Sequence, residues 1–370
     1  MIPYVRGVVT KQAHVGVPDG LYEEEYGREG FFGDYAHIYR EHSPVGWTNI
    51  EGPLKPRSYS LSKLDFTGNS FLENRKNILF NNDLKIDYCL LKHKMNYCFR
   101  NADGDDLFFV HSGHGKIFTD FGTFTYEVGD YIQIPKGCVY LLSPESATSF
   151  LIIESNSKFN FPQKGLLGHH ALFDPAILEV PDLDKKMTFP QSSQFENEYE
   201  LIIKRNNLYT RVHYPYPPIT TVGWKGTLSP IKLNVKDIRP LSCERYHLPP
   251  SAHTTFVAKN FVICSFLPRP LETGDEKAMK VPFYHSNIDF DEVLFYHSGD
   301  FFSKEGIDKT MITHHPSGIH HGPHKGAVEK AKSLERTDEI AVMIDTRNPL
   351  VASDDAESVE NKNYWKSWKG

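Results

Sequence analysis

NADGDDLFFVHSG at residues 101–113 and NIDFDEVLFYHSG at residues 287–299 are two copies of one sequence pattern, 186 residues apart. The acidic pair Asp105-Asp106 of the first copy coincides with Asp291-Glu292 of the second, and both copies end in His-Ser-Gly. An internal repeat at a long period predicts two structural units of the same kind. The chain is therefore expected to fold as a duplicated unit.

The repeat continues downstream of both copies. The first half contains Pro135-Lys-Gly137-Cys-Val-Tyr140, and the second half contains Pro316-Ser-Gly318-Ile-His-His321. Each half thus carries a Pro-x-Gly-x-x-aromatic element after its acidic pair. This agreement extends the duplication beyond a single short motif.

The repeated unit has the pattern of β-structure. LFFVHSGHGKIFTDFGTFTYEVGDYIQIP, residues 107–135, consists of short aromatic and β-branched runs separated by Gly and Asp turns. Turns at this spacing are typical of β-sandwiches and barrels. Helical patterns are confined to residues 327–335 and 354–368, which are expected to lie at the periphery. The expected fold is mainly β, a two-part jelly-roll barrel or sandwich with few peripheral helices.

Domain boundaries follow from the repeat and from the segments rich in Pro, Gly and Tyr. The expected parts are an N-terminal arm (1–60), a first β-unit (61–155), a connecting segment (156–200), a second β-unit (201–350) and a tail with helical pattern (351–370). The arm is expected to wrap over the core or over a neighbouring subunit.

Composition excludes several classes of partner. The 370 residues carry a formal net charge of −6, which gives no electrostatic footprint for nucleic acid or an anionic membrane. No apolar run is long enough for a transmembrane helix, and the N-terminus lacks the apolar region of a signal peptide. The five cysteines form no C-x-x-C pair, so each is expected to be a small buried hydrophobe. A cytoplasmic location is expected.

Histidine is concentrated in one part of the chain. Seven of the 18 histidines lie between residues 285 and 325, which suggests a metal site. The arrangement of His285, Glu292 and His321 on the repeat resembles the ligand pattern of cupins, in which such residues point into a jelly-roll barrel. The corresponding first-half positions hold Phe99, Asp106 and Tyr140, so the first half is expected to have kept the fold and lost the metal.

Two histidines and one carboxylate with open positions form the facial triad of non-haem Fe(II) oxygenases. His285 and Glu292 are seven residues apart, so on one unbroken strand they would face opposite sides. A turn or bulge within residues 286–291 is therefore required. His314, His320 and His324 are interpreted as solvated or supporting residues. His315 either hydrogen-bonds a metal ligand or O₂, or packs in the core.

The sequence resembles homogentisate 1,2-dioxygenases over most of its length. The resemblance rests on FYHSNIDFDE (283–292), HPSGIHHGPHKG (315–326), YHLPPSAHTTF (246–256) and the first repeat copy, with further agreement in residues 18–33 and 35–47. It implies an Fe(II) enzyme of phenylalanine and tyrosine breakdown that opens the ring of homogentisate with O₂ to give maleylacetoacetate. It also implies a homo-oligomer, a hexamer in this family.

The resemblance assigns roles to individual residues. His285, Glu292 and His321 fall on the iron ligands, and His247 falls on the histidine that accepts a proton from the substrate, with His253 as the alternative base. His321 and Phe301 are the expected substrate contacts. The family commonly has Tyr where this chain has Phe301, and Phe cannot hydrogen-bond a substrate hydroxyl. The expected substrate is therefore homogentisate or a close hydroquinone-type analogue.

Two points stay open at the level of sequence. Arg269 and Arg347 are candidates by charge for binding a substrate carboxylate, although a surface role fits each of them. A cupin that uses Zn²⁺ or Mn²⁺ for isomerisation or hydrolysis, or a bicupin that only binds small molecules, is the alternative function. The retained ligand trio in one half favours an enzyme.

Overall fold

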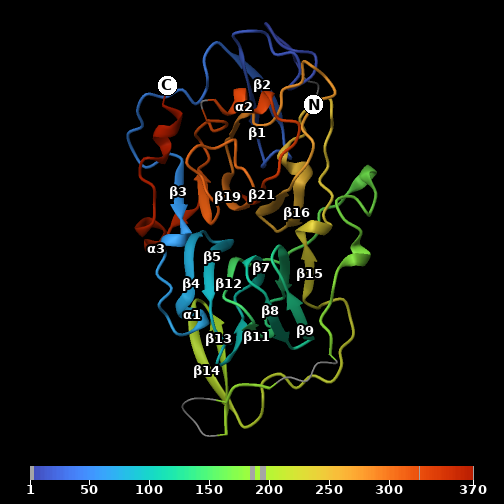
Figure 1. Cartoon of the computed structure of the whole chain (residues 1–370), viewed down its shortest axis with the longest axis vertical. Helices are drawn as coiled ribbons and strands as arrows, with labels where there is room; N and C mark the ends of the chain where they lie inside the picture. Colours follow the sequence, from blue (N-terminus) through green and yellow to red (C-terminus); the bar gives the residue numbers. More distant parts are fainter. Residues whose placement is uncertain (1–3, 184–187, 192–196, 325, 370) are drawn as a thin grey trace. The chain divides into compact units, whose positions relative to one another are not determined.

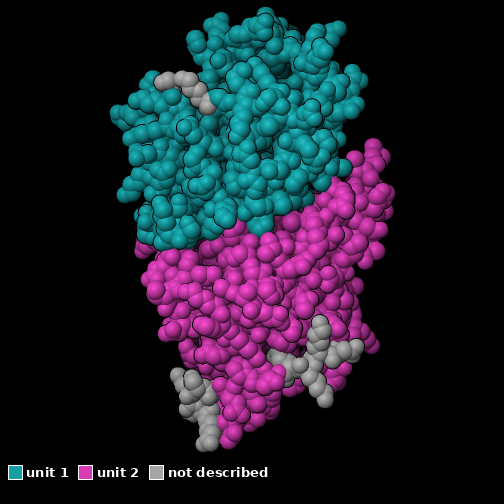
Figure 2. Space-filling model, in the orientation of Figure 1, with its two compact units in different colours: residues 1–63, 240–350, 357–370 teal, residues 64–239, 351–356 magenta. Residues whose placement is uncertain are grey.

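The computed structural model describes residues 4–183, 188–191, 197–324 and 326–369, and these residues are mainly β (Figure 1). The chain divides into two compact units, which Figure 2 shows in different colours. Unit 1 comprises residues 1–63, 240–350 and 357–370. Unit 2 comprises residues 64–239 and 351–356. The mainly β, two-part architecture expected from the repeat is confirmed.

Unit 1 contains two sheets, and both combine strands from the two ends of the sequence (Figure 1, blue and orange). Its six-stranded sheet has the order β16 (Thr254–Val257), β17 (Phe261–Phe266), β21 (Ile340–Thr346), β19 (Asp291–Ser298), β20 (Met311–His315) and β3 (Arg57–Ser60). Its three-stranded sheet has the order β18 (Tyr284–Asn287), β1 (Tyr22–Gly27) and β2 (Tyr35–Arg40).

Unit 2 contains two larger sheets. The seven-stranded sheet has the order β15 (Ile231–Asn234), β10 (Asp130–Ile134), β7 (Asp105–Ser112), β12 (Thr148–Ser155), β5 (Leu84–Leu91), β4 (Arg75–Phe80) and β22 (Val351–Ala352). The six-stranded sheet has the order β14 (Leu208–Tyr214), β13 (Tyr199–Arg205), β6 (Cys98–Asn101), β11 (Val139–Pro144), β8 (Gly115–Thr119) and β9 (Gly122–Tyr126).

Strand pairing shows that the two units repeat one topology. In unit 1, β19 lies between β20 and β21, and in unit 2 the equivalent β7 lies between β10 and β12. Strand β18 pairs in parallel with β1, as its counterpart β6 pairs in parallel with β13. All other named strand pairs are antiparallel. The parallel pairs are set by segments outside the repeated motif, which is why the motif alone did not reveal them.

The compact units differ from the boundaries drawn on the sequence. Strands β13, β14 and β15 lie beyond residue 197 but belong to unit 2, because β13 pairs with β6 and β15 pairs with β10. Residues 1–60 supply β1, β2 and β3 to the sheets of unit 1, so they are part of the unit's sheet structure. Non-local hydrogen bonding decides both assignments.

Helices are few and short, as expected. They are α1 (Phe71–Asn74), α2 (Ala327–Lys332) and α3 (Asp354–Ser358), with 3-10 turns at Leu61–Lys63, Gly165–Leu167, Pro175–Ile177, Val235–Asp237, Pro250–His253 and Tyr364–Trp368. The predicted helix at 327–335 ends earlier, at Lys332, and the helical pattern at 354–368 is broken into α3 and a 3-10 turn. Among the described residues no helix is long and apolar enough to cross a bilayer.

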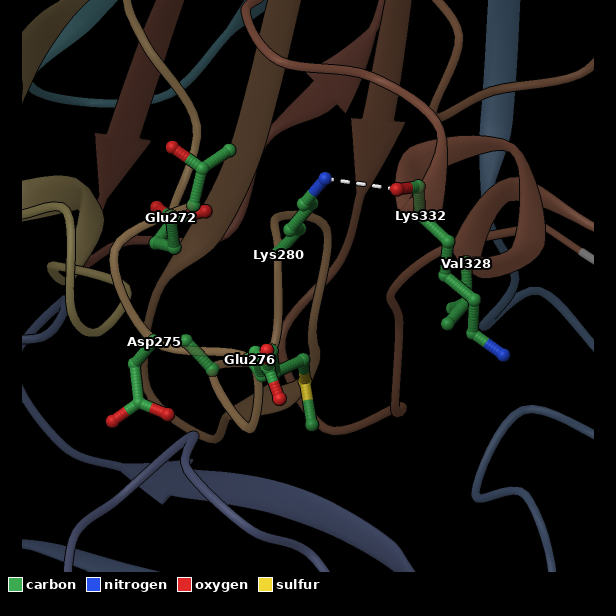
Figure 3. Close-up of a pocket in the computed structure, with 9 residues that line it drawn as sticks. Glu272, Asp275, Glu276, Lys280, Val328 and Lys332 are labelled. Atoms are coloured by element: carbon green, nitrogen blue, oxygen red, sulfur yellow. Dashed lines mark hydrogen bonds between the residues drawn. The ribbon is translucent and has the colours of Figure 1, made fainter.

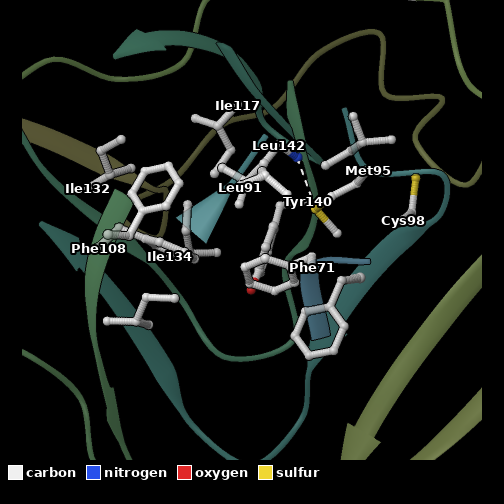
Figure 4. Packing of buried hydrophobic residues seen from close by; sticks show 14 of the residues in the cluster. Phe71, Leu91, Met95, Cys98, Phe108, Ile117, Ile132, Ile134, Tyr140 and Leu142 are labelled. Carbon is white, nitrogen blue, oxygen red and sulfur yellow. Dashed lines mark hydrogen bonds between the residues drawn. The ribbon is translucent and has the colours of Figure 1, made fainter. Parts of the chain in front are cut away.

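The core of unit 2 is rich in aromatic side chains (Figure 4). Phe99 and Tyr140 are fully buried, with their ring centroids 5.4 Å apart. Full burial of a large apolar side chain contributes ~1.5–3 kcal/mol to stability. All five cysteines are free, and four of them are buried: Cys89, Cys98, Cys138 and Cys264. They serve as core residues here, while Cys243 is partly exposed.

Candidate metal centre

Three side chains predicted as metal ligands converge inside unit 1. His285 and His321 each place Nε2 3.4 Å from the Oε2 atom of Glu292. One potential ligand atom from each residue lies within 4.8 Å of the other two, and all three residues are buried. The structure therefore brings together two imidazoles and one carboxylate, as the sequence pattern predicted.

The trio is built from three different segments. His285 lies on β18 and Glu292 is the second residue of β19, with a turn at residues 288–290 between them. The predicted turn is thus present, and it removes the conflict posed by the seven-residue spacing. His321 follows β20 and forms an antiparallel bridge with His285, in which each backbone N–H donates to the other's carbonyl at 3.0 Å.

The imidazole nitrogens of the trio are available for a cation. The Nδ1 atom of His285 lies 3.2 Å from the carbonyl of Phe283, which fixes the ring and directs Nε2 toward Glu292. Neither ring nitrogen of His321 has a hydrogen-bond partner among the described residues, although the side chain is buried. Burial and the neighbouring His285 lower the pKa of His321 to about 4. A neutral histidine with an unpartnered buried nitrogen fits a metal ligand.

Glu292 is held in its charged form. Burial alone would raise its pKa, but His321, His285 and His315 together hold that pKa well below its usual range. The Nδ1 atom of His315 lies 2.7 Å from Oε1 of Glu292, on the side of the carboxylate away from Oε2. His315 itself is fully buried on β20, directly opposite Glu292 in the ladder. It is therefore placed to orient the carboxylate while Oε2 faces the other two histidines.

A cavity of about 90 Å³ adjoins the trio, and His285 and Glu292 form part of its wall. His247 also lines it and is 4% exposed, with its Nε2 atom lacking a hydrogen-bond partner in the described structure. The Nδ1 atom of His247 lies 3.1 Å from Oε1 of Glu272. Burial lowers the pKa of His247, whereas the Glu272 carboxylate raises it. This pair gives the cavity a basic nitrogen that is oriented by a carboxylate.

Two further residues weighed on sequence grounds lie in the same cavity wall. His253 is buried, has no carboxylate partner, and its pKa is lowered to about 3 by burial, Arg269 and His247. Arg269 is 7% exposed and makes no ion pair with any described carboxylate, so the surface role considered for it is wrong. Arg347 is exposed and lies 3.5 Å from Glu29, away from this cavity.

Phe301 does not occupy the position expected for a substrate contact. Its ring packs edge-on against Tyr296 in the hydrophobic core, with centroids 4.9 Å apart, and it is absent from the cavity wall. The neighbouring Phe302 lines the cavity instead. Residues 301–304 form a turn, in which the backbone N–H of Lys304 donates to the carbonyl of Phe301 at 3.1 Å, and this turn directs Phe302 rather than Phe301 to the cavity.

The remaining histidines of the cluster make supporting contacts. His314 hydrogen-bonds Asp291 at 2.9 Å, and the backbone N–H of Glu305 donates to His324 Nδ1 at 2.6 Å. His320 is partly exposed and contacts Glu24. These contacts agree with the interpretation of all three as supporting residues.

Unit 2 carries an arginine where unit 1 has the trio. Phe99 and Tyr140 are paired across β6 and β11, as His285 and His321 are bridged in unit 1. Asp106 accepts hydrogen bonds from Tyr140 at 3.2 Å and from Arg75 at 3.1 Å. The Arg75 side chain, 6% exposed, also pairs with Asp87 and Glu154. A buried guanidinium thus supplies the positive charge at the position that lost its histidines.

A second hollow, of about 480 Å³, is lined in part by Glu272 (Figure 3). Asp275, Glu276 and Lys280 line it, and Lys280 donates a hydrogen bond of 2.9 Å to the carbonyl of Lys332. It contains none of the trio. Glu272 therefore borders this hollow while it also contacts His247 of the first cavity.

Sequence reasoning missed several residues of the cavity wall. Lys304 and Glu339 in the wall, and Glu272 behind His247, were not singled out, because each is an isolated charged residue without a motif. Burial lowers the pKa of Lys304 to about 8 and raises the pKa of Glu339 to about 7. The signal that finds them is burial of a charged side chain, which a single sequence does not contain.

Comparisons with known proteins show what this chain is similar to. The model of the homogentisate 1,2-dioxygenase N-terminal family matches residues 52–235. A Saccharolobus solfataricus protein named "Putative dioxygenase" is 34% identical over 387 residues, covering 100% of this chain and 99% of the relative. The homogentisate 1,2-dioxygenase of Bradyrhizobium diazoefficiens is 25% identical, covering 76% of this chain and 65% of its own length. A cupin 2 conserved barrel domain protein from Leptotrichia buccalis aligns with 79% of this chain and 96% of its own, at 11% identity and a TM-score of 0.34.

Proposed function

Because this chain belongs to the homogentisate 1,2-dioxygenase family, we propose that it is an Fe(II)-dependent dioxygenase that opens an aromatic ring. The proposed substrate is homogentisate, giving maleylacetoacetate in phenylalanine and tyrosine breakdown, or a close hydroquinone-type analogue. The observation that carries the proposal is the buried trio of His285, Glu292 and His321. Two of its members, His285 and Glu292, line a cavity that His247 also lines.

The donor set fits a non-haem iron site. Two neutral imidazoles and one carboxylate, all buried, are the ligands that Fe(II) oxygenases use, and they leave coordination positions open. Fe(II) held there would supply the redox and Lewis-acid chemistry that ring opening by O₂ requires. His315 would keep Glu292 oriented through the 2.7 Å contact. The cavity wall would exclude bulk water from the reacting groups.

His247 is the proposed base. A hydroquinone must lose a proton from a hydroxyl group as it is activated, and His247 presents an unpartnered Nε2 to the cavity. Glu272 at Nδ1 would stabilise the imidazolium that forms. His253 lacks such a carboxylate, and its pKa of about 3 makes it a poor proton acceptor. The structure therefore favours His247 over His253.

Arg269 is the proposed partner of a substrate carboxylate. Its guanidinium lies in the cavity wall without an ion pair to any described acidic residue. A buried guanidinium that feels the charges of Glu272 and Glu339 without forming an ion pair with either is suited to bind an anionic group of a ligand. Phe302, also in the wall, would pack against the aromatic ring. The proposal also includes a homo-oligomer, which is a hexamer by family resemblance. Size-exclusion chromatography with light scattering would measure the oligomeric state.

Oxygen uptake tests the proposal. Protein loaded anaerobically with Fe(II) is expected to consume O₂ with homogentisate and to form a ring-opened product with new absorbance. His321→Ala should abolish uptake, whereas His42→Ala, at an exposed position, should retain it. Uptake with gentisate but not with homogentisate would change the substrate within the same class. Stoichiometric, redox-inert zinc that supports an activity would instead favour the isomerase or hydrolase alternative.

A further inference from the structure

A second cluster of metal-ligand side chains lies near the N-terminus of the chain. His14, Glu23 and His37 each offer one potential ligand atom within 4.8 Å of the other two. The Nδ1 atom of His14 is 2.9 Å from Glu23 Oε1, and its Nε2 atom is 3.5 Å from Oε2 of Glu25. His37 Nε2 lies 3.9 Å from the same Glu25 oxygen. Glu23 and Glu25 thus approach the two different nitrogens of the His14 ring, and none of these side chains belongs to the trio at His285.

The nitrogen atoms of this cluster are buried without hydrogen bonds. His14 is 4% exposed and Glu23 is 1% exposed. His14 Nδ1 and His37 Nε2 have no hydrogen-bond partner among the described residues, because the short contacts to the carboxylates are not aligned for one. Buried polar atoms are normally hydrogen-bonded, so unpartnered nitrogens facing carboxylates indicate an additional occupant.

The fold holds the four side chains in place. Glu23 and Glu25 are two residues apart on β1, so both point to the same face of the sheet. Strand β2 pairs antiparallel with β1 and sets His37 directly opposite Glu25. The hydroxyl of Tyr39 donates to Glu23 Oε2 at 2.5 Å, and the backbone N–H of His14 donates to Glu23 Oε1 at 2.8 Å. Such outer hydrogen bonds orient a ligand carboxylate.

We propose that His14, Glu23 and His37, with Glu25 beside them, form a second metal site that binds a divalent transition ion such as Zn²⁺. Imidazole and carboxylate suit zinc, and His14, Glu23 and His37 offer two imidazoles and one carboxylate within reach of one ion. A divalent cation would neutralise the two buried carboxylates, whose burial without a counter-charge is costly. No described Lys or Arg pairs with Glu23 or Glu25.

The proposed role of this site is to fix the wall of the reaction cavity. The His14 ring lies 5.8 Å from the His247 ring and 4.9 Å from the Phe283 ring, centroid to centroid. Both neighbours line the cavity next to the trio. A bound ion would tie residues 14, 23 and 37, which come from three segments, into one rigid support behind His247.

A proton is the competing occupant. Burial lowers the pKa of His14, but Glu23 and Glu25 raise it more, to about 9, in the ion-free cluster. A metal ion must displace this proton, so binding is expected to weaken as the pH falls.

Metal counting tests the second site without relying on turnover. Chelator-treated full-length protein is equilibrated with Zn²⁺ at pH 8, separated from free metal, and analysed for zinc by mass spectrometry. The expected stoichiometry is two zinc ions per chain in the unmodified protein and one in Glu23→Gln, which keeps the shape of the side chain. His321→Ala should also bind one, and the combination of both substitutions none. His42→Ala, an exposed histidine a few residues beyond β2, should still bind two.

The outcomes that overturn the proposal are equally defined. One zinc per chain in the unmodified protein, unchanged by Glu23→Gln and lost in His321→Ala, would assign the cluster to a protonated His14. Loss of both ions in Glu23→Gln while the circular dichroism spectrum stays intact would also contradict two independent sites. Because zinc counting does not involve O₂, failure here is distinguishable from failure of the proposed oxygenase activity.

Discussion

Glu272→Gln is the substitution that tests the base most directly. It removes the carboxylate charge from His247 while keeping the size and the hydrogen-bonding capacity of the side chain. Glu272 is not one of the trio, so metal content is expected to stay the same. The variant therefore separates proton transfer from metal binding.

The size of the effect follows from the geometry of the pair. The Nδ1–Oε1 distance is 3.1 Å, and both side chains are 4% exposed, so solvent screens the interaction little. A hydrogen bond to a charged group contributes about 1.5–3 kcal/mol. Each ~1.4 kcal/mol is tenfold in rate, so kcat/KM is expected to fall about 10- to 100-fold. That loss stays within the ~10²- to 10⁴-fold that general base catalysis supplies.

The pH dependence of kcat/KM shows in which direction the substitution changes the pKa of His247. Burial lowers the pKa of His247 and Glu272 raises it, so removing the carboxylate charge lowers that pKa further. The acid limb of the kcat/KM profile, which reports the free base, should then move to lower pH at a reduced plateau.

Oxygen uptake between pH 5 and pH 9 measures both effects. Glu276→Gln, in the wall of the second hollow, is the matched control. An unchanged limb and plateau, or a limb that moves to higher pH, would refute the role of the pair.

Two further predictions concern the buried charged groups at equivalent places in the two units, Arg75 in unit 2 and His315 in unit 1. Arg75→Met should lower the free energy of unfolding by about 3–5 kcal/mol in urea titrations, since it leaves Asp87 and Asp106 as buried carboxylates without their cation, whereas Glu154 keeps Lys204. A loss below ~1 kcal/mol, the value of a surface pair, would contradict this. His315→Ala should weaken metal binding at the trio about 10- to 100-fold in competition titrations, because Glu292 loses its 2.7 Å contact. An affinity equal to that of the unmodified protein would show that His315 only packs.

Much of the fold could be predicted because it is written in local patterns. The short aromatic and β-branched runs with Gly and Asp turns predicted strands, and the matching 101–113 and 287–299 segments predicted two related units. Gly299 is an example of a turn residue that both copies of the motif contain and that the structure requires. Its φ of +97° and the backbone oxygen of Asp338, 2.4 Å from where a Cβ would lie, require glycine at the end of β19.

The pairing of distant segments was beyond the sequence. Strand β1 joins β18 more than 250 residues later, and β13 returns to β6. The predicted arm therefore became part of a sheet of unit 1, and the start of the predicted second unit became part of a sheet of unit 2. Hydrogen bonding between strands carries no signature in either partner alone, since any extended segment offers the same donors and acceptors.

The sequence by itself determined which residues could bind a metal, because His285, Glu292 and His321 stand at repeat positions where only one copy has ligand side chains. The tertiary structure decided what surrounds them. It placed Glu272 against His247 and buried Arg269 in the cavity wall. It put Phe302 rather than Phe301 in that wall, and it brought His14, Glu23 and His37 close together. The physical reason is that ligand type is a property of a residue, whereas burial, charge pairing and the direction of a side chain arise only when distant segments pack together.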